Sequence, residues 1–201
     1  MNKLILTGVA FLFLSGTILA QSLLPPVFSY SHKKTSYITL KNGSTVEGTI
    51  KDLDRKKGII EEVKLKDGSG KVIKLKPSEI DYMYLPASGW DKMGSSLGFL
   101  SDASRWDNDD LDQDKIARGY VYIESSDVMV KKKRMQLLVQ LLNPHFSQKI
   151  KVYHDPLAGE TASIGIAGVK VAGGLDKSYY VKKESAKAAV RLKKKDYSDE
   201  F

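Results

Sequence analysis

Apolar and polar residues alternate in short segments along residues 37–85, and turn-forming residues separate these segments. Alternation with a period of two, interrupted by Gly, Asn, Asp and Pro, is typical of half-buried strands joined by tight turns. The pattern predicts about five strands that form a small barrel. We expect strands at residues 37–40, 44–53, 59–66, 72–75 and 82–85, with one helical turn at residues 76–80.

The turn residues of this segment carry as much information as its apolar positions. Asn42-Gly43 favours a two-residue hairpin in which both residues have positive φ. Gly48 lies in the middle of a strand and predicts a bulge or a sharp bend. Residues 55–58 and 67–70 predict the next two turns. Alternation in the strand 59–66 directs three side chains inward, namely Ile60, Val63 and Leu65.

The N-terminal strand order resembles that of SH3-like and Sm-like small barrels. The resemblance rests on the turn at residues 77–80 and on Leu40, Asn42, Gly43, Val46, Gly48 and Ile50. Sm-like barrels bind RNA, but the second signature turn of that family, a Gly beside a base-contacting basic residue, is missing here. We therefore expect no specific nucleic-acid partner.

Strand patterns return in residues 118–201, and they predict an antiparallel β-sandwich or a curled sheet. The expected strands are 119–124, 127–132, 148–154, 162–171, 179–182 and 188–192, of which the last two form a closing hairpin. Residues 134–142 fit a strand or a helix equally well. The predicted fold class is therefore mainly β, with an SH3-like small barrel followed by this second β-rich domain.

The first residues have the pattern of a secretory signal peptide. A lysine at position 3 precedes an apolar run, and small residues precede a cleavage site that we expect after Ala20. We expect export to the periplasm, the outer membrane or the medium, and no transmembrane segment after cleavage. The chain contains no cysteine, so disulfides and thiolate metal sites are excluded.

These patterns divide the chain into five expected regions. After the signal peptide, 1–20, comes an extended leader, 21–36, that contains two adjacent prolines. The barrel, 37–85, and the β-rich domain, 118–201, are separated by a Gly- and Ser-containing connector with an acidic stretch, 86–117. We expect the domain boundary to lie inside this connector.

The second domain resembles uncharacterised exported proteins of Bacteroidota-type bacteria across roughly residues 119–201. The resemblance rests on three phrases, QLLNPHFSQKIKVYHDPLAGET, GGLDKSYYVKK and AVRLKKKDYSDEF. It implies a cell-envelope protein of no established activity and supplies no catalytic residues. Related chains continue beyond the position of Phe201, so we expect this chain to be short at its C-terminus.

Charge is unevenly distributed along the chain, whose formal net charge is +8. Residues 102–114 contain six Asp and one Arg, whereas the residues that follow are rich in lysine. Asp110, Asp112 and Asp114 have the alternating spacing of calcium-loop ligands. An EF-hand is nevertheless excluded, because Lys115 stands where the loop needs Gly and Val121 stands where it needs Glu. A looser calcium site and a solvated acidic loop both stay open.

The residue inventory offers little for catalysis. No serine lies in a Gly-x-Ser-x-Gly or Ser-x-x-Lys setting. A metal-dependent hydrolase could use His145, His154 and Asp155, although such residues at strand ends are more often turn residues. We expect a non-catalytic protein without a cofactor, in a binding or structural role.

A ligand surface is the main alternative for the second domain. Tyrosines in its strands could stack on sugars, and nearby basic residues could attract a polyanionic surface. The candidate residues are Tyr120, Tyr122, Tyr179, Tyr180, Lys131, Lys132 and Arg134. Tyrosines in strands more commonly serve half-buried packing. The expected partners are thus an envelope protein or a polyanionic surface.

Overall fold

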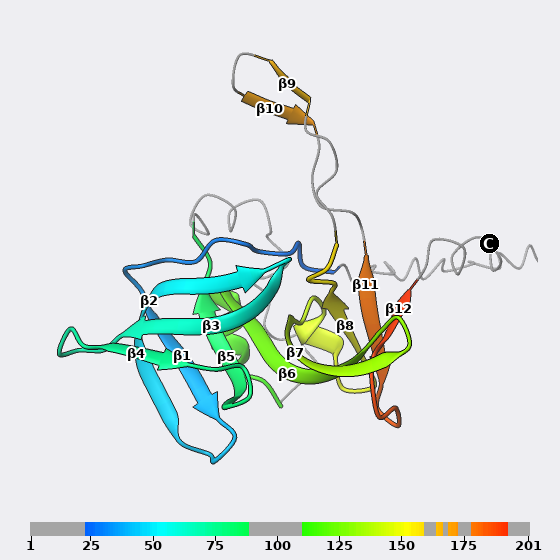
Figure 1. The fold of residues 1–201 in the computed structure, drawn as a ribbon, viewed down its shortest axis with the longest axis horizontal. Coiled ribbons are helices and arrows are strands. Elements are labelled where there is room, and N and C mark those ends of the chain that lie inside the picture. The colour runs from blue at the N-terminus through cyan, green and yellow to red at the C-terminus, as the bar shows by residue number, and fades with distance from the viewer. Residues whose placement is uncertain (1–22, 89–109, 159–163, 167–168, 173–177, 193–201) are drawn as a thin grey trace, which may run out of the picture.

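The computed structural model describes residues 23–88, 110–158, 164–166, 169–172 and 178–192. These residues are mainly β, and the expected fold class is confirmed at that level (Figure 1). The sheets are open, and they do not close into the small barrel that the N-terminal pattern predicts.

One seven-stranded sheet dominates the fold. Its strands lie in the order β4-β3-β2-β1-β5-β6-β7, and every neighbouring pair is antiparallel. The strands are β1 (Thr35–Leu40), β2 (Thr45–Lys56), β3 (Ile59–Lys66), β4 (Val72–Leu75), β5 (Ile80–Pro86), β6 (Tyr120–Val130) and β7 (Lys133–Gln140).

This sheet joins the two regions that the sequence separates. β5 pairs with β6 over five residue positions, from Tyr82 opposite Glu124 to Pro86 opposite Tyr120. The domain boundary expected within residues 86–117 therefore does not divide the protein into two separate sheets, because strands from both sides of it belong to one sheet. The pairing brings the end of the first strand set directly against the start of the second.

A smaller sheet packs next to the second half of the large one. It has the order β12-β11-β8 and consists of β8 (Ile150–His154), β11 (Tyr179–Lys183) and β12 (Val190–Leu192). Isolated bridges connect it to the rest, from Leu141 to Tyr153 and from Val128 to Ala189. Two short helical elements, α2 (Gln113–Ala117) and η4 (Pro144–Phe146), lie before β6 and after β7.

Two expectations for the second half need correction, and the structure decides one alternative that the sequence left open. Residues 119–124 and 127–132 form one long strand, β6. Residues 134–142, for which periodicity left two options, form a strand over 133–140. In place of the single strand expected at 162–171, the described residues form two paired strands, β9 (Ile164–Ile166) and β10 (Val169–Ala172), which extend away from the body of the molecule (Figure 1).

The hairpin at Asn42-Gly43 also differs from its prediction. It joins β1 to β2 as expected, but only Gly43 has positive φ, at 83°. The Gly43 N–H donates to the Leu40 carbonyl at 2.8 Å, and the Asn42 side chain accepts from the Ser44 N–H at 3.0 Å. A longer loop with a single left-handed residue explains this geometry, because the first part of such a loop is an ordinary turn.

The two-residue turn with two positive φ angles occurs instead at Lys57-Gly58. Their φ values are 50° and 83°, and the pair joins β2 to β3. Mirror-image turns of this kind match the right-handed twist of the flanking strands. The expected turn at residues 55–58 is therefore confirmed, with strand β2 running up to Lys56.

Gly48 serves a close approach of backbone. An added Cβ would lie 2.5 Å from the Lys66 carbonyl oxygen, so only glycine fits where the end of β3 passes β2. The register shifts of β2 against β3 come later, between Ile50 and Asp52 and between Asp54 and Arg55. The bulge expected at Gly48 is thus displaced along the strand.

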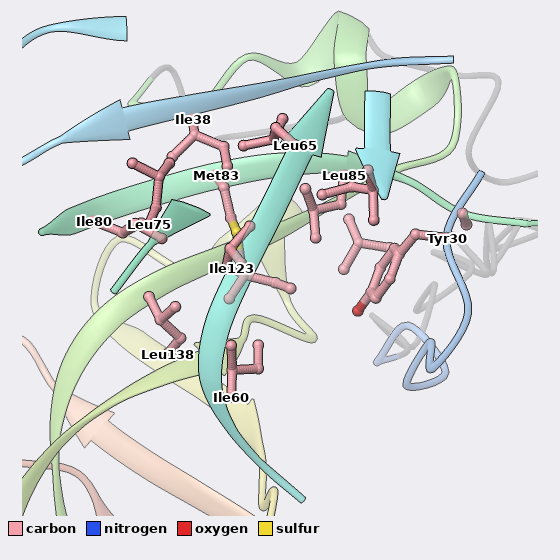
Figure 2. Packing of buried hydrophobic residues seen from close by; sticks show 14 residues of the cluster. Tyr30, Ile38, Ile60, Leu65, Leu75, Ile80, Met83, Leu85, Ile123 and Leu138 are labelled. Atoms are coloured by element: carbon pink, nitrogen blue, oxygen red, sulfur yellow. The ribbon is translucent and has the colours of Figure 1, made fainter. Parts of the chain in front are cut away.

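The main core lies inside the curve of the large sheet. Ile60, Val63 and Leu65 are buried there, as their alternation predicts. Ile123 of β6 and Leu138 of β7 belong to the same cluster and point into the same interior (Figure 2). A second cluster, rich in tyrosine, includes Tyr84, Tyr122, Tyr153 and Tyr180. Each half therefore supplies side chains to both cores.

The residues of the leader from Leu24 onward are held against both halves. The Leu24 N–H donates to the Leu142 carbonyl at 2.7 Å, and Tyr30 forms an isolated bridge with Ala87. Tyr30 is buried in the main core. Among the described residues, no helix is both long and apolar enough to span a membrane.

Candidate ligand-binding cavity

A cavity of about 390 Å³ opens where four segments meet. One wall is the leader, with Val27 and Phe28, and another is the hairpin between β2 and β3. Ile123 of β6 and Leu138 of β7 form its floor, and residues 154–158 close the remaining side. We call this space the hairpin cavity. Its walls are mostly apolar, as is usual for small-molecule sites.

Gly58 fixes the position of the β2–β3 hairpin at this site. A Cβ added to Gly58 would lie 1.7 Å from the Pro156 carbonyl oxygen, far inside van der Waals contact. The tip of the hairpin therefore rests directly on the backbone that follows β8. This contact joins two segments distant in sequence and places Arg55 and Lys57 at the cavity.

The leader is positioned by hydrogen bonds on both sides of the cavity. The Val27 N–H donates to the Gln140 side chain at 3.0 Å, and the Tyr30 hydroxyl donates to the Val27 carbonyl at 3.0 Å. Arg55 donates to the Phe28 carbonyl at 3.4 Å, with its guanidinium 5.9 Å from the centre of the Tyr30 ring. Burial raises the pKa of Tyr30 to about 12, so its hydroxyl stays neutral.

His154 is, with Tyr30, one of two buried titratable groups in the described lining of the cavity. It ends β8, is 8% exposed, and meets the Phe28 ring edge-on at a centroid distance of 5.3 Å. Its Nε2 is buried and has no hydrogen-bond partner among the described residues. Burial lowers the pKa of His154, against the opposing effect of Asp155, so the ring is neutral near pH 7. Its Nε2 has almost no accessible surface, so the ring contributes wall area to the cavity.

The charged side chains in the described lining of the cavity are all positive. Arg55 and Lys57 are both exposed, and no Asp or Glu belongs to the described lining. A half-open apolar space with two cations and no carboxylate attracts anions and disfavours cations. The arrangement fits a ligand that combines an apolar body with a negative charge.

Behind His154, Asp155 holds the small sheet together. Its carboxylate is fully buried, accepts from Ser178 Oγ at 2.8 Å, and forms an ion pair with Arg191, whose Nε lies 2.7 Å away. Arg191 Nε also lies 2.8 Å from Ser178 Oγ, to which it donates. A nucleophilic serine needs a base that can take its proton, usually a histidine. Here Ser178 is bonded to a carboxylate and a guanidinium, which is a structural arrangement.

The hypothesis of a hydrolase centre at His145, His154 and Asp155 finds no support. Among the described residues there is no group of three His, Asp or Glu side chains that could hold a metal ion. His145 Nδ1 lies 3.3 Å from the Gln113 amide oxygen, and burial lowers the His145 pKa to about 4. His154 instead lines the hairpin cavity, and Asp155 is paired with Arg191.

The calcium candidates Asp110, Asp112 and Asp114 all lie within the described residues, whereas residues 102–109 of the acidic stretch do not, and Asp110 is exposed. Asp112 is the N-cap of α2, where its carboxylate accepts from the Lys115 N–H at 2.9 Å and also contacts the Lys115 ammonium. Asp114 is exposed in the first turn of the same helix. The Asp112 carboxylate is therefore already engaged by Lys115 and by the helix N-terminus.

The predicted tyrosine platform does not form an exposed surface. Tyr122 and Tyr180 are 6% and 1% exposed, so their ring faces are covered. Tyr120 is half-buried beside Tyr37, at a centroid distance of 5.9 Å, and Tyr179 is half-buried in β11. Adjacent residues in a strand face opposite sides, which explains why Tyr179 and Tyr180 cannot share a surface.

The basic candidates lie apart from the buried tyrosines. Lys131 and Lys132 are exposed at the turn between β6 and β7. Arg134 pairs with Asp127 across the same hairpin, and the Arg134 hydrogen bond lowers the pKa of Asp127. None of these three residues lines the hairpin cavity.

Glu124 is a partly buried acid whose role the sequence did not indicate. Its carboxylate accepts from Lys151 Nζ at 2.8 Å and from the hydroxyls of Tyr153 and Tyr122. Burial, together with this carboxylate, raises the pKa of both tyrosines. These hydrogen bonds partner the polar atoms of all four side chains and link strand β6 to strand β8.

Sequence reasoning missed most of the hairpin cavity, because its residues come from segments far apart in the chain. Only His154 had been singled out, and for a different chemistry. The turn signal at residues 55–58 identified the hairpin, but nothing in the sequence indicated that it rests on Pro156.

No protein-family model, curated protein or solved structure matches the chain. The candidate site is therefore defined by the geometry of the hairpin cavity.

Proposed function

We propose that this chain is a non-catalytic binding protein of the bacterial cell envelope and that the hairpin cavity is its ligand site. The observation that carries the proposal is the cavity itself, with apolar walls, two exposed cations and a neutral buried imidazole. Convergence of a few polar groups on an apolar pocket is the usual form of a binding site.

The envelope location rests on the chain's own sequence. Residues 1–20 have the charge, apolar run and small residues of a signal peptide. The absence of cysteine is compatible with an exported protein that relies on its hydrophobic core. The similarity of residues 119–201 to exported proteins of Bacteroidota-type bacteria supports the same location.

The order of the first five strands supports an SH3-like arrangement for residues 35–86. These strands lie in the order β4-β3-β2-β1-β5, and a turn at residues 77–79 precedes β5. In this protein the free side of β5 pairs with β6, so the proposed unit is built into a larger sheet. Such folds host many functions, so the ligand has to be argued from the site.

Two measurements test the proposal. The full chain, expressed with its N-terminus intact, is fractionated, and the N-terminal residue of the mature protein is determined. We expect an envelope protein that begins at Gln21; an unprocessed protein in the cytosol would refute the location.

The second measurement is native mass spectrometry of the protein purified from its own envelope. We expect an additional bound mass, which Ala158→Trp removes because Ala158 is a small, half-buried residue of the cavity lining. The matched control is Ala186→Trp, at a half-buried alanine outside the lining. A bound mass that survives Ala158→Trp, or no bound mass at all, would contradict the cavity as the site.

A further inference from the structure

We infer that the hairpin cavity binds a single-chain amphiphile with an anionic head, of which a medium-chain carboxylate is the simplest example. This inference rests on the proposed binding function and adds the chemical class of the ligand. It draws on the size of the cavity, its apolar walls and the cations of the hairpin.

The size of the cavity limits the length of the ligand. A volume of about 390 Å³ is that of roughly a dozen water molecules in the liquid, at ~30 Å³ each. A saturated chain with a carboxylate and about ten carbons has a similar number of non-hydrogen atoms. Ile60, Ile123 and Leu138 present apolar surface for such a chain.

The charge of the cavity selects the head group. Arg55 carries five N–H donors, of which one is used by the Phe28 carbonyl, and Lys57 is exposed in the adjoining turn. Both belong to the hairpin that Gly58 fixes against Pro156, so their backbone positions are defined before a ligand arrives. A guanidinium and an ammonium together suit a carboxylate, whose two oxygens can accept from both.

His154 forms part of the wall that such a ligand would contact. Its ring lies edge-on to Phe28 at a centroid distance of 5.3 Å, and its Nε2 has almost no accessible surface, so the ring offers the ligand packing contact and no hydrogen bond from Nε2. Burial lowers the pKa of His154, so the ring adds no charge to those of Arg55 and Lys57 near pH 7. Its ring signals therefore report whether the cavity is occupied.

The experiment titrates the full chain with three ligands of equal chain length: decanoate, decanol and decyltrimethylammonium. Affinity is measured by calorimetry, and the three histidine rings of the chain are followed by NMR. We expect decanoate to bind most tightly and to shift the ring signals of His154. His32 and His145, which do not line the cavity, serve as internal controls.

Two matched double variants test the role of charge. Arg55→Gln with Lys57→Gln removes both cations of the cavity, whereas Lys131→Gln with Lys132→Gln removes two exposed cations elsewhere. Each exposed ion pair contributes a few-fold in affinity, so the first variant should weaken decanoate about tenfold. Decanol should be unaffected by either variant, and decanoate should be unaffected by the second.

Chain length provides a further measurement. From hexanoate to decanoate, each added methylene should raise the affinity by about fourfold, because it buries apolar surface. Beyond about ten carbons the gain should stop, since the cavity is then full. Phosphatidylglycerol vesicles are tested separately. Co-sedimentation that depends on Arg55 and Lys57 would identify a membrane lipid as the source of the anionic chain. Decanoate binding without co-sedimentation would identify a free acid as the ligand.

The outcomes separate this inference from the proposed function. Equal binding of decanoate and decanol, both blocked by Ala158→Trp, would overturn the anionic head and keep the cavity as the site. The same conclusion would follow if decanoate failed to bind while a native bound mass still disappeared in Ala158→Trp. Decanoate binding that leaves His154 unshifted and survives Ala158→Trp would place the site elsewhere and overturn both.

Discussion

Substitution of Gly58 by alanine tests the contact that defines the hairpin cavity. Gly58 and Gly43 both lie in hairpin turns and have the same φ of 83°. An added Cβ at Gly43 meets nothing within 4 Å, whereas at Gly58 it would lie 1.7 Å from the Pro156 oxygen. Gly43→Ala is therefore a matched control that has the same backbone strain without the clash.

The expected magnitudes follow from this difference. Alanine at a left-handed position costs about 1–2 kcal/mol, and both variants share that cost. At Gly58 the methyl group is ~1.7 Å too close, since ordinary contact begins at 3.4 Å. Relieving such overpacking costs about 1–3 kcal/mol more. We expect Gly58→Ala to lose about 2–5 kcal/mol of stability and Gly43→Ala about 1–2 kcal/mol.

Urea-induced unfolding at neutral pH measures both free energies of unfolding. The hairpin also carries Arg55 and Lys57, so lifting it from Pro156 should weaken decanoate binding in Gly58→Ala and leave it unchanged in Gly43→Ala. Equal destabilisation by the two substitutions, with equal decanoate affinity, would show that the contact with Pro156 does not hold the hairpin in place.

Three further predictions concern polar groups that are buried or partly buried. His145 takes up its proton near pH 6.5 when unfolded and near pH 4 when folded, so the unfolded state binds more protons between these values. Stability should therefore fall by about 2 kcal/mol from pH 7 to pH 5, and His145→Gln should remove that part of the loss in urea titrations; an unchanged pH dependence would contradict the assignment. Glu124→Gln should cost about 2 kcal/mol in the same assay, because Lys151 loses its charged acceptor, and a change below about 0.5 kcal/mol would show that water replaces it. Asp155→Asn should lower the free energy of unfolding by about 2 kcal/mol, and the loss is moderate because the guanidinium of Arg191 is half-exposed. Arg191→Lys keeps the positive charge, so thermal unfolding should show a smaller loss of stability for this variant.

Local features of the fold could be predicted from the sequence because they depend on residues close together in the chain. The strands β3 and β4 and the turn at residues 67–70 lie where alternation and turn residues place them. The choice of turn type was harder. Asn42-Gly43 is the stronger signal for two positive φ angles, yet Lys57-Gly58 adopts them, because the contact with Pro156 and the strand twist act there.

Features that depend on distant pairing could not be predicted in this way. β5 pairs with β6 although residues 87–119 separate them, and no local pattern specifies which strand edge a later strand will join. The candidate site depends on the same pairing. Tyr122 and Tyr180 were candidates for an exposed ligand platform, but packing of the small sheet against β6 buries both.

The shared sheet implies that binding and folding are linked through the whole unit. The floor of the hairpin cavity consists of Ile123 and Leu138, and its wall includes Ile60, all of which belong to the main core. Because β5 pairs with β6, the burial of Ile60 from the first half depends on the burial of Leu138 from the second, and we expect the two halves to fold cooperatively. A ligand that binds only the folded cavity stabilises it by RT ln(1 + [L]/Kd), and this gain cannot be confined to one half. The protein should therefore unfold in a single transition, and decanoate should raise the midpoint of that transition. Two separate transitions, of which decanoate shifts only one, would show that the halves fold independently.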